Sequence, residues 1–166
     1  MTVPRPFAEP PYALSVCSLR PVQSEAEASA LGALLAAMAP WRTLGYTATA
    51  LQRYLWRQDA TLYRYAVVVQ DRPIGVVCVR YPWLRGAYLE LIGLEATVQR
   101  RGIGREIVHW LEGQARLAAH NVWVLVSAFN APARTFYARQ GFAEIGTLKD
   151  FVRPGADEVL LRKVVR

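Results

Sequence analysis

The sequence has few of the residues that build metal sites and disulfide frameworks, and it has no long apolar run. Its 166 residues include two cysteines and two histidines. Cys17 and Cys78 lack metal-ligand spacing, so we expect two small buried residues in a reducing compartment. No stretch of 18 apolar residues occurs, and prolines interrupt the first 16 residues, where a secretory signal needs a continuous apolar core. We therefore expect a cytoplasmic protein without a bound metal or a membrane span.

Positive charge is abundant, with a formal net charge of +7 and a pI near 9.8. Such a balance favours an anionic partner, which could be a nucleic acid, an acidic surface or a phosphorylated small molecule. The arginines are scattered, apart from a dense group at Arg100, Arg101 and Arg105. No basic stripe with interleaved aromatic residues is present, which argues against a nucleic-acid-binding domain.

The order of apolar patterns predicts one mixed α/β domain over residues 14–166, preceded by a flexible proline-rich arm over residues 1–13. Capping and periodicity predict helices near residues 24–38, 47–57, 102–118 and 130–140. Apolar and β-branched runs predict strands at 14–19, 62–69, 74–81, 87–95, 122–129, 142–147 and 158–165. This order implies a mixed sheet covered by helices, with a strand-helix-strand crossover around residue 102.

The segment VQRRGIGREI, residues 98–107, has two glycines at the start of a predicted helix. Gly102 and Gly104 leave the first amide N–H groups of the helix unobstructed, and the helix dipole adds partial positive charge there, which makes an anion site. The alternative is a tight turn in which glycine is only sterically convenient. A P-loop is excluded because Arg105 and Glu106 follow the second glycine, and a dinucleotide fingerprint is excluded by Ile107.

A second segment, NAPARTFYARQGF, covers residues 130–142. Asn130 is placed to cap a helix, Phe136 and Tyr137 fall near its end, and Gly141 sits where a left-handed residue ends it. Taken alone, the aromatic pair is better explained as part of a core, because aromatic residues on a short helix usually pack there.

Together these segments resemble the GNAT superfamily of acetyl-CoA-dependent N-acetyltransferases. The family's phosphate loop, Q/R-x-x-G-x-G/A, matches Gln99, Gly102 and Gly104, and its N-x-x-A-x-x-F-Y-x-x-x-G-F block matches residues 130–142. The resemblance covers residues 14–166 and implies the GNAT fold, a mixed sheet of six to seven strands flanked by about four helices, with splayed central strands. It also implies transfer of an acetyl group from acetyl-CoA to a primary amine of a small molecule, peptide or protein. A non-catalytic acyl-CoA-binding or sensing module is the alternative.

The resemblance also implies where acetyl-CoA binds. Its pantetheine arm would lie in the gap between two splayed strands, its diphosphate on the N–H groups around the two glycines, and an asparagine would face it from the other side. The implied residues are Ile92, Gly93, Leu94, Gln99, Arg100, Arg101, Gly102, Ile103, Gly104, Arg105 and Asn130. A glycine inside a strand, as at position 93, is typical of a bulge or a close backbone approach.

Two catalytic roles follow from the same resemblance. Tyr137 occupies the position of the family's frequent general acid, which would protonate the departing thiolate, and Glu90 corresponds to a proposed base in relatives. A strand-end glutamate that faces solvent or pairs with an arginine is the alternative for Glu90.

The acceptor amine is not readable from these motifs. Residues 40–41 and 151–163 resemble ribosomal-protein alanine acetyltransferases, but Leu125 stands where those relatives carry a catalytic glutamate. Residues 124–137 resemble polyamine and small-amine acetyltransferases, for which a basic chain is an unfavourable host unless acids cluster locally. We expect Trp41 and Tyr46 to line the acceptor pocket, and a homodimer is possible because relatives are often dimeric.

Overall fold

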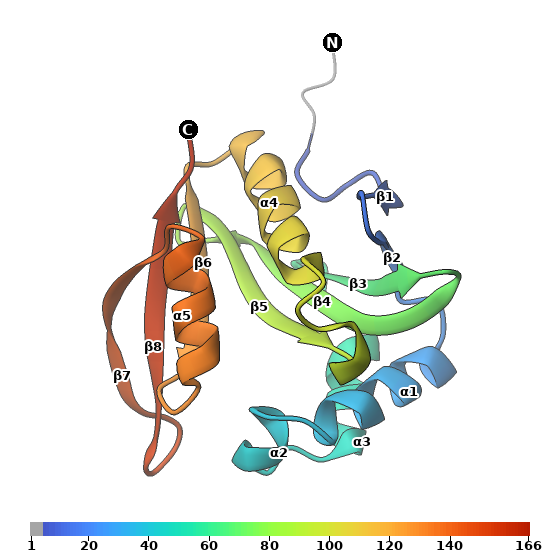
Figure 1. The fold of residues 1–166 in the computed structure, drawn as a ribbon, viewed down its shortest axis with the longest axis horizontal. Coiled ribbons are helices and arrows are strands. Elements are labelled where there is room, and N and C mark those ends of the chain that lie inside the picture. Colours follow the sequence, from blue (N-terminus) through green and yellow to red (C-terminus); the bar gives the residue numbers. More distant parts are fainter. Residues whose placement is uncertain (1–4) are drawn as a thin grey trace.

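The computed structural model describes residues 5–166, which form one mixed sheet with helices on both faces (Figure 1). The eight strands lie in the order β1-β2-β3-β4-β5-β6-β8-β7, and β5–β6 is the parallel pair of an otherwise antiparallel sheet. In chain order the elements are β1 (Tyr12–Ala13), β2 (Ser18–Pro21), α1 (Glu25–Ala36), α2 (Trp41–Leu44), α3 (Ala48–Trp56), β3 (Leu62–Val69), β4 (Arg72–Trp83), β5 (Gly86–Leu94), the 3-10 helix η1 (Ala96–Val98), α4 (Ile103–Arg116), β6 (Asn121–Ser127), α5 (Ala131–Arg139), β7 (Ala143–Arg153) and β8 (Ala156–Val164).

The mixed fold expected from the sequence is confirmed, with two small additions. Strand β1 has two residues and helix α2 has four. Two residues are one period of strand alternation and four residues are little more than one helical turn, so neither element repeats an apolar pattern that could be recognised.

Three helices begin where the sequence supplies a capping side chain. The Ser24 hydroxyl accepts from the Glu27 N–H at 3.1 Å, the Thr47 hydroxyl from the Ala50 N–H at 3.1 Å, and the Asn130 carbonyl oxygen caps α5. Each bond satisfies an N–H group that has no partner within its own helix, and such a cap typically contributes about 1 kcal/mol. The helix boundaries near the site are therefore set by local chemistry.

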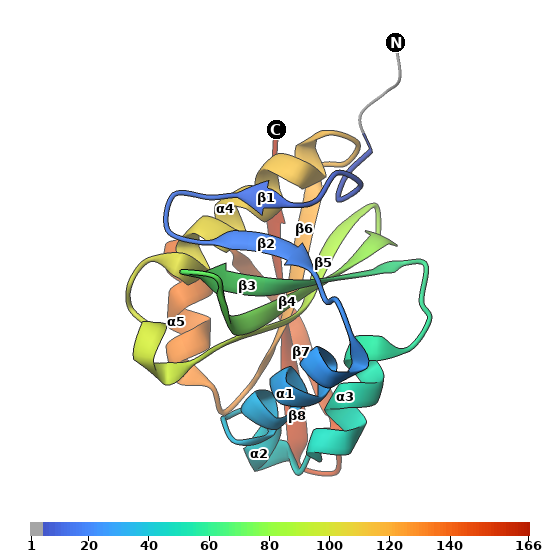
Figure 2. The same ribbon diagram turned by 90° about the vertical axis from the view of Figure 1, so that its right-hand side faces the viewer.

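The sheet separates two apolar cores (Figure 2). On one face α4 and α5 pack through residues such as Ile107, Leu111 and Tyr137. On the other face α1 and α3 pack through residues such as Leu35 and Leu55. Helix α4, with 14 residues, has charged residues on its outer side. None of the helices within residues 5–166 has both the length and the apolar character that a membrane span requires.

Residues that precede the predicted domain boundary at residue 14 already pack against the rest of the domain. Phe7 is 1 % exposed, its ring contacts Trp110 of α4 at 5.6 Å between centroids, and its carbonyl accepts from the Tyr65 hydroxyl at 2.7 Å. Residues 5–13 therefore do not behave as the loosely packed arm that their prolines suggest, because one aromatic side chain inserts into the core beneath them. Residues 1–4 of that predicted arm lie outside the described residues.

The strand expected at residues 14–19 is wrong in its boundaries. Residues 14–17 form a tight connection, closed by a bond from the Leu14 N–H to the Cys17 carbonyl at 2.9 Å, and β2 starts at Ser18. Alternation of apolar residues continued through the turn, which concealed the reversal of the chain.

Strands β5 and β6 pair over four residues and then separate. Their parallel register joins residues 86–89 to residues 121–124, ending at Leu89 and Val124. The register of β4 on β5 shifts at the same point, since Val79 faces Leu89 and Cys78 faces Leu91, which leaves Glu90 as a bulged residue. Leu89 belongs to the α4 core and Leu91 to the α1–α3 core, although residues two apart in a regular strand share one face. The bulge thus turns β5 away from β6, as bulges turn strands generally.

Candidate active site

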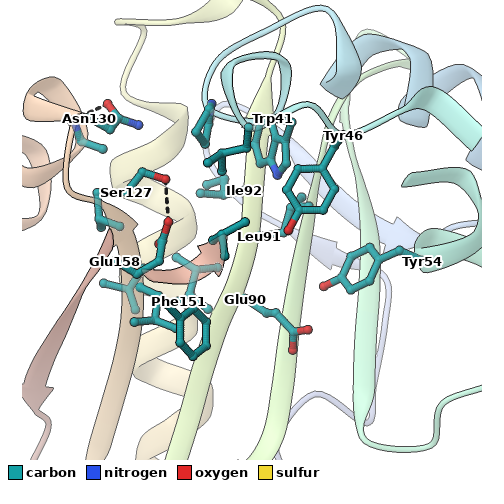
Figure 3. Close-up of a pocket in the computed structure, with 18 of the residues that line it drawn as sticks. Trp41, Tyr46, Tyr54, Glu90, Leu91, Ile92, Ser127, Asn130, Phe151 and Glu158 are labelled. Atoms are coloured by element: carbon teal, nitrogen blue, oxygen red, sulfur yellow. Dashed lines mark hydrogen bonds between the residues drawn. The ribbon is translucent and has the colours of Figure 1, made fainter. Parts of the chain in front are cut away.

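A cavity of about 430 Å³ lies where β5 and β6 separate (Figure 3). Residues 88–92 of β5 form one side of it and residues 124–127 of β6 form another. Helices α2, α3 and α5 and the β7–β8 hairpin contribute the remaining walls, through Pro40, Trp41, Leu44, Tyr46, Ala50, Leu51, Tyr54, Arg57, Asn130, Ala133, Tyr137, Phe151, Val152 and Glu158. The two walls from the sheet are the strands that the sequence resemblance predicts to be splayed.

The edge of β5 that faces the cavity has no strand beside it beyond Leu89. Antiparallel β4 pairs with the opposite edge, as Val77 with Ile92 and Cys78 with Leu91, while the pairing with β6 has ended. In a regular sheet the N–H and C=O groups of such an edge would bond to the next strand. Residues 90–94 therefore offer backbone donors and acceptors to a ligand in the gap.

Gly93 is explained by packing from the helix layer. A Cβ at this position would collide with the Leu35 side chain and would lie 3.1 Å from the Trp41 ring. The bulge that an in-strand glycine suggests lies instead three residues earlier, at Glu90. The glycine therefore lets α1 and the Trp41 ring approach β5 closely, which positions one wall of the cavity.

The N-terminus of α4 is open, as an anion site requires. Gly102 is the N-cap in a left-handed conformation, with φ of +82°, and a Cβ built there meets no atom within 4 Å. The first helical bond runs from the Glu106 N–H to the Gly102 carbonyl at 3.0 Å, so the N–H groups of residues 103–105 precede the helical ladder. Arg100, Arg101 and Arg105 are exposed around this end. Bare N–H groups and positive charge coincide at one point.

Gln99 has a structural partner in this loop. Its side-chain amide donates to the Leu94 carbonyl at 2.8 Å, which joins the end of β5 to the residue that precedes the arginines. Glu106, an acid in the first turn of α4, accepts from the Val16 N–H at 3.1 Å. Its carboxylate is thereby directed toward the β1–β2 connection.

Helix α5 contributes Asn130 and Tyr137 to the cavity wall. Asn130 uses its carbonyl oxygen to accept from the Ala133 N–H at 3.3 Å, as the helix cap. Tyr137 is 4 % exposed and contacts the rings of Phe136 and Phe142. Burial raises the pKa of the Tyr137 phenol, so this hydroxyl keeps its proton at neutral pH.

Glu90 also lines the cavity, but both of its carboxylate oxygens bind an arginine. Arg80 Nε donates to one oxygen at 2.5 Å and Arg80 Nη2 to the other at 3.1 Å. The same guanidinium reaches Asp59 at 3.1 Å and the Thr61 hydroxyl at 2.8 Å. Hydrogen bonds from Thr61, and then Arg80, hold the pKa of Asp59 at about 2. The arginine pair was the structural alternative for Glu90, and the structure contains it.

A second carboxylate, which the sequence did not single out, lies across the cavity. Glu158 of β8 is 7 % exposed, and its Oε1 accepts from the Ser127 hydroxyl of β6 at 2.7 Å (Figure 3). Burial raises the pKa of the Glu158 carboxyl, which the Ser127 hydrogen bond partly offsets. The one available signal was an acid inside the alternating strand ADEVLLRKV, which is equally typical of a solvent-facing position.

Aromatic side chains of the helix layer form the wall opposite Glu158. Trp41, Tyr46 and Tyr54 lie on this side (Figure 3), so the expectation that Trp41 and Tyr46 line a pocket agrees with the geometry. Arg153 of the β7–β8 hairpin donates to the carbonyls of Thr43 and Leu44 at 3.1 and 3.2 Å. These bonds tie the hairpin to the end of α2 and close one end of the cavity.

The residues expected at the site thus form two groups. Glu90, Ile92, Asn130 and Tyr137 line the cavity itself. Gly93 and Leu94 continue the free edge of β5, and residues 99–105 form the loop and helix start beyond it. The Ile103 side chain is 3 % exposed and belongs to the core, so only its backbone can contribute at the helix mouth.

A family model described as the acetyltransferase (GNAT) family matches residues 31–142 of this chain. The match covers 112 of 166 residues and includes β5, the mouth of α4 and all of α5. Among curated proteins no sequence matches the chain.

Solved structures share the fold at low sequence identity. An acetyltransferase from Thermus thermophilus has 20% identity and a TM-score of 0.72, over 90% of this chain and 97% of that one. NAA60 of Arabidopsis thaliana, solved with a bisubstrate analogue, has 19% identity and a TM-score of 0.71, over 91% and 100%. An aminoglycoside 6'-N-acetyltransferase, solved with coenzyme A, has 15% identity and a TM-score of 0.69, over 91% and 97%.

Proposed function

The chain belongs to the acetyltransferase (GNAT) family and is an acetyl-CoA-dependent acyltransferase, and on that premise we propose that its acceptor is a primary amine that attacks the thioester directly. The observation that carries the proposal is the cavity between β5 and β6. A free strand edge forms one side of it, and two buried side chains that can exchange protons, Tyr137 and Glu158, lie in its walls.

The residues present fit acetyl-CoA. The unpaired edge of residues 90–94 can bond to the amide groups of a pantetheine arm, and the cavity beside it has room for the arm. The open N-terminus of α4 at Gly102, with its three arginines, suits a diphosphate. Bound here, acetyl-CoA would supply the activated acyl group, and the N–H groups of residues 103–105 would hold its phosphates.

Acetyl transfer needs a proton donor for the departing sulfur, and Tyr137 is placed for this role. Its phenol is buried in the cavity wall and holds its proton, as a general acid must at neutral pH. A thiolate is a tolerable leaving group even without a proton, so the loss of this group slows turnover without abolishing it. A backbone N–H near Leu94 is our candidate for stabilising the oxyanion.

Glu90 has less freedom to act as the base than the sequence suggests. Both of its carboxylate oxygens already accept hydrogen bonds from Arg80, so the carboxylate is occupied before an amine arrives. We therefore assign Glu90 a positioning role, as the cavity-lining partner of an Arg80 that also binds Asp59, and we seek the base elsewhere in the cavity.

Thermal-shift titration with acetyl-CoA, followed by thiol-release assays with peptides, polyamines, aminoglycosides and amino acids, tests the proposal. Acetyl-CoA should raise the melting temperature, and at least one primary amine should release the thiol. Tyr137→Phe should lower kcat about 100-fold, the low end of what general acid–base catalysis contributes, while acetyl-CoA binding is kept. Tyr63→Phe, on β3 outside the cavity, is the matched control. Binding without turnover by any amine would indicate an acyl-CoA-binding module instead.

A homodimer and a cytoplasmic location stay predictions of the sequence. Light scattering coupled to gel filtration decides the first, and fractionation of cells that express the chain decides the second.

A further inference from the structure

Glu158 lies in β8, which pairs with β6 on one side and with β7 on the other. In the β6–β8 ladder Glu158 faces Ser127, the last residue of β6, and in the β7–β8 ladder it faces Leu148. Its side chain lines the cavity and is 7 % exposed. A carboxylate is therefore held on a strand that is paired on both sides, in the wall that lies across the cavity from β5.

Glu158 differs in its partner from the other buried glutamate, Glu112, and from the other glutamate that lines the cavity, Glu90. Glu112, the other buried glutamate among the described residues, binds Lys163 at 2.5 Å, and Glu90 binds Arg80. The bond recorded for Glu158 comes from the neutral Ser127 hydroxyl. A charged carboxylate buried without a cation is costly, so a fold keeps one where a cation arrives with the substrate.

The charged and titratable groups around Glu158 leave its carboxylate available to bind a cationic group of a substrate. Tyr88 and Glu90 face the cavity from β5, Tyr137 from α5, and Tyr46, Tyr54 and Arg57 from the helix layer. Within residues 5–166, Arg57 is the one cation that lines the cavity, and its guanidinium is engaged over the Tyr54 ring and beside Asp59.

Tyr88 lies between the two carboxylates. Burial raises the pKa of the Tyr88 phenol, and the negative charges of Glu90 and Glu158 raise it further. In Figure 3 the Glu90 side chain points away from Ser127 and Glu158, so the two acids face different regions. Glu158 is the acid that faces the gap between β5 and β6.

We propose, on the basis of the proposed amine acetylation, that Glu158 is the general base of the reaction: its carboxylate binds the acceptor as an alkylammonium and removes one proton. The neutral amine then forms the C–N bond to the thioester carbonyl carbon, and the C–S bond breaks. Tyr137 gives its proton to the leaving sulfur and regains one from the attacking nitrogen, directly or through water. Glu158 releases its proton to solvent, so one ammonium yields one amide, one thiol and one proton.

The aromatic wall supports the same substrate class. Trp41, Tyr46 and Tyr54 face Glu158 across the cavity (Figure 3), and aromatic faces attract organic cations. The Tyr54 hydroxyl is buried and has no hydrogen-bond partner in the described part of the chain, so it can bond to an acceptor that enters. An amine attached to an apolar or hydroxyl-bearing group fits this surface.

The test compares Glu158→Gln with wild type and with Glu144→Gln, an exposed acid of β7 that pairs with Arg134. Thiol release is measured from pH 6 to pH 10 with the best amine of the panel, and acetyl-CoA binding is measured by thermal shift. At pH 7 the kcat of Glu158→Gln should fall about 10²- to 10⁴-fold with acetyl-CoA binding unchanged. The deficit should shrink toward pH 10, because an alkylamine with a pKa near 10.4 then loses its proton without a base.

A second variant and a spectroscopic readout keep the test decisive if Glu158→Gln folds poorly. Ser127→Ala removes the hydrogen bond that favours the charged carboxylate, so the acidic limb of the pH profile should move to higher pH. Carbon-13 NMR of glutamate carboxyl groups should follow the same shift in the titration of the Glu158 signal, without any turnover.

Three outcomes overturn the assignment. They are a Glu158→Gln variant within threefold of wild type at pH 7, a deficit equal at every pH, or a Ser127→Ala profile that does not move. A wild-type enzyme that acetylates no primary amine would instead overturn the proposed function. The two failures are therefore separate, since the first requires an active wild-type enzyme and the second an inactive one.

Discussion

Gly102 and Gly155 allow the anion site at α4 to be tested with a matched pair of substitutions. Both are left-handed, with φ of +82° and +81°, and a Cβ built on either meets no atom within 4 Å. Gly102 starts α4 and Gly155 turns the β7–β8 hairpin. Alanine at either position therefore has the same backbone strain and no clash within the protein.

The stability changes should be nearly equal. A left-handed alanine costs about 1–2 kcal/mol relative to glycine, and 1 kcal/mol shifts the melting temperature by about 2–4 °C in a chain of this size. Each variant should therefore melt roughly 2–8 °C below wild type. Differential scanning fluorimetry without ligand measures this baseline.

The affinities for acetyl-CoA should differ. In the proposed binding mode a phosphate passes through the open space at Gly102 to reach the N–H groups of residues 103–105, and a methyl group would occupy that space. At a ligand concentration 100 times the wild-type Kd, binding adds about 2.7 kcal/mol of stability, whereas a variant that binds tenfold more weakly gains only about 1.4 kcal/mol. Gly102→Ala should show at most the smaller gain and Gly155→Ala the larger one.

Equal gains for the two variants would refute the reasoning. They would mean that the diphosphate does not rest on the α4 N-terminus and that its open end is only a sterically convenient turn. Isothermal titration calorimetry, performed well below both melting temperatures, separates a change in Kd from a change in the melting baseline.

Further predictions concern packing, charge and pH. Gly93→Ala should destabilise the fold by about 1–3 kcal/mol, because its Cβ collides with Leu35, and denaturant titration measures this. Lys163→Met should cost about 3 kcal/mol, since it removes the closest cation from the buried Glu112, and an unchanged urea midpoint would contradict it. Burial raises the folded-state pKa of Glu158, so its ionisation lowers stability as pH rises from the ordinary glutamate range through the folded pKa. Glu158→Gln should therefore melt above wild type at pH 8 and level with it near pH 4, and a lower melting temperature at pH 8 would be contrary evidence.

The sequence predicts those parts of the fold that local chemistry determines. Ser24, Thr47 and Asn130 each cap the helix that follows them, and Gly141 has the positive φ of +88° that a terminating residue requires. These signals act within four residues, so a single segment contains all the information. The left-handed glycine that begins α4, Gly102, is a local signal of the same kind, whereas an anion bound there stays a prediction.

Features that depend on contacts between distant segments were not predictable. The burial of Phe7 depends on Trp110 and Tyr65, which lie far along the chain. The bulge at Glu90 is visible only in the register of β4 on β5. Glu158 becomes a candidate only once β8 is placed beside β6, an order that no single segment specifies.

The bulge at Glu90 also means that the substrate slot depends on one surplus residue. If Glu90 were deleted, the pair Cys78–Leu91 would directly follow the pair Val79–Leu89 in a regular ladder, and Leu91 would stay on the face opposite to that of Leu89. The parallel pairing of β5 with β6 could then continue toward Ser127 and close the cavity between the two strands. A sheet with continuous pairing would have no cavity between β5 and β6. The space for a ligand in this protein therefore depends on an irregularity in the strand pairing.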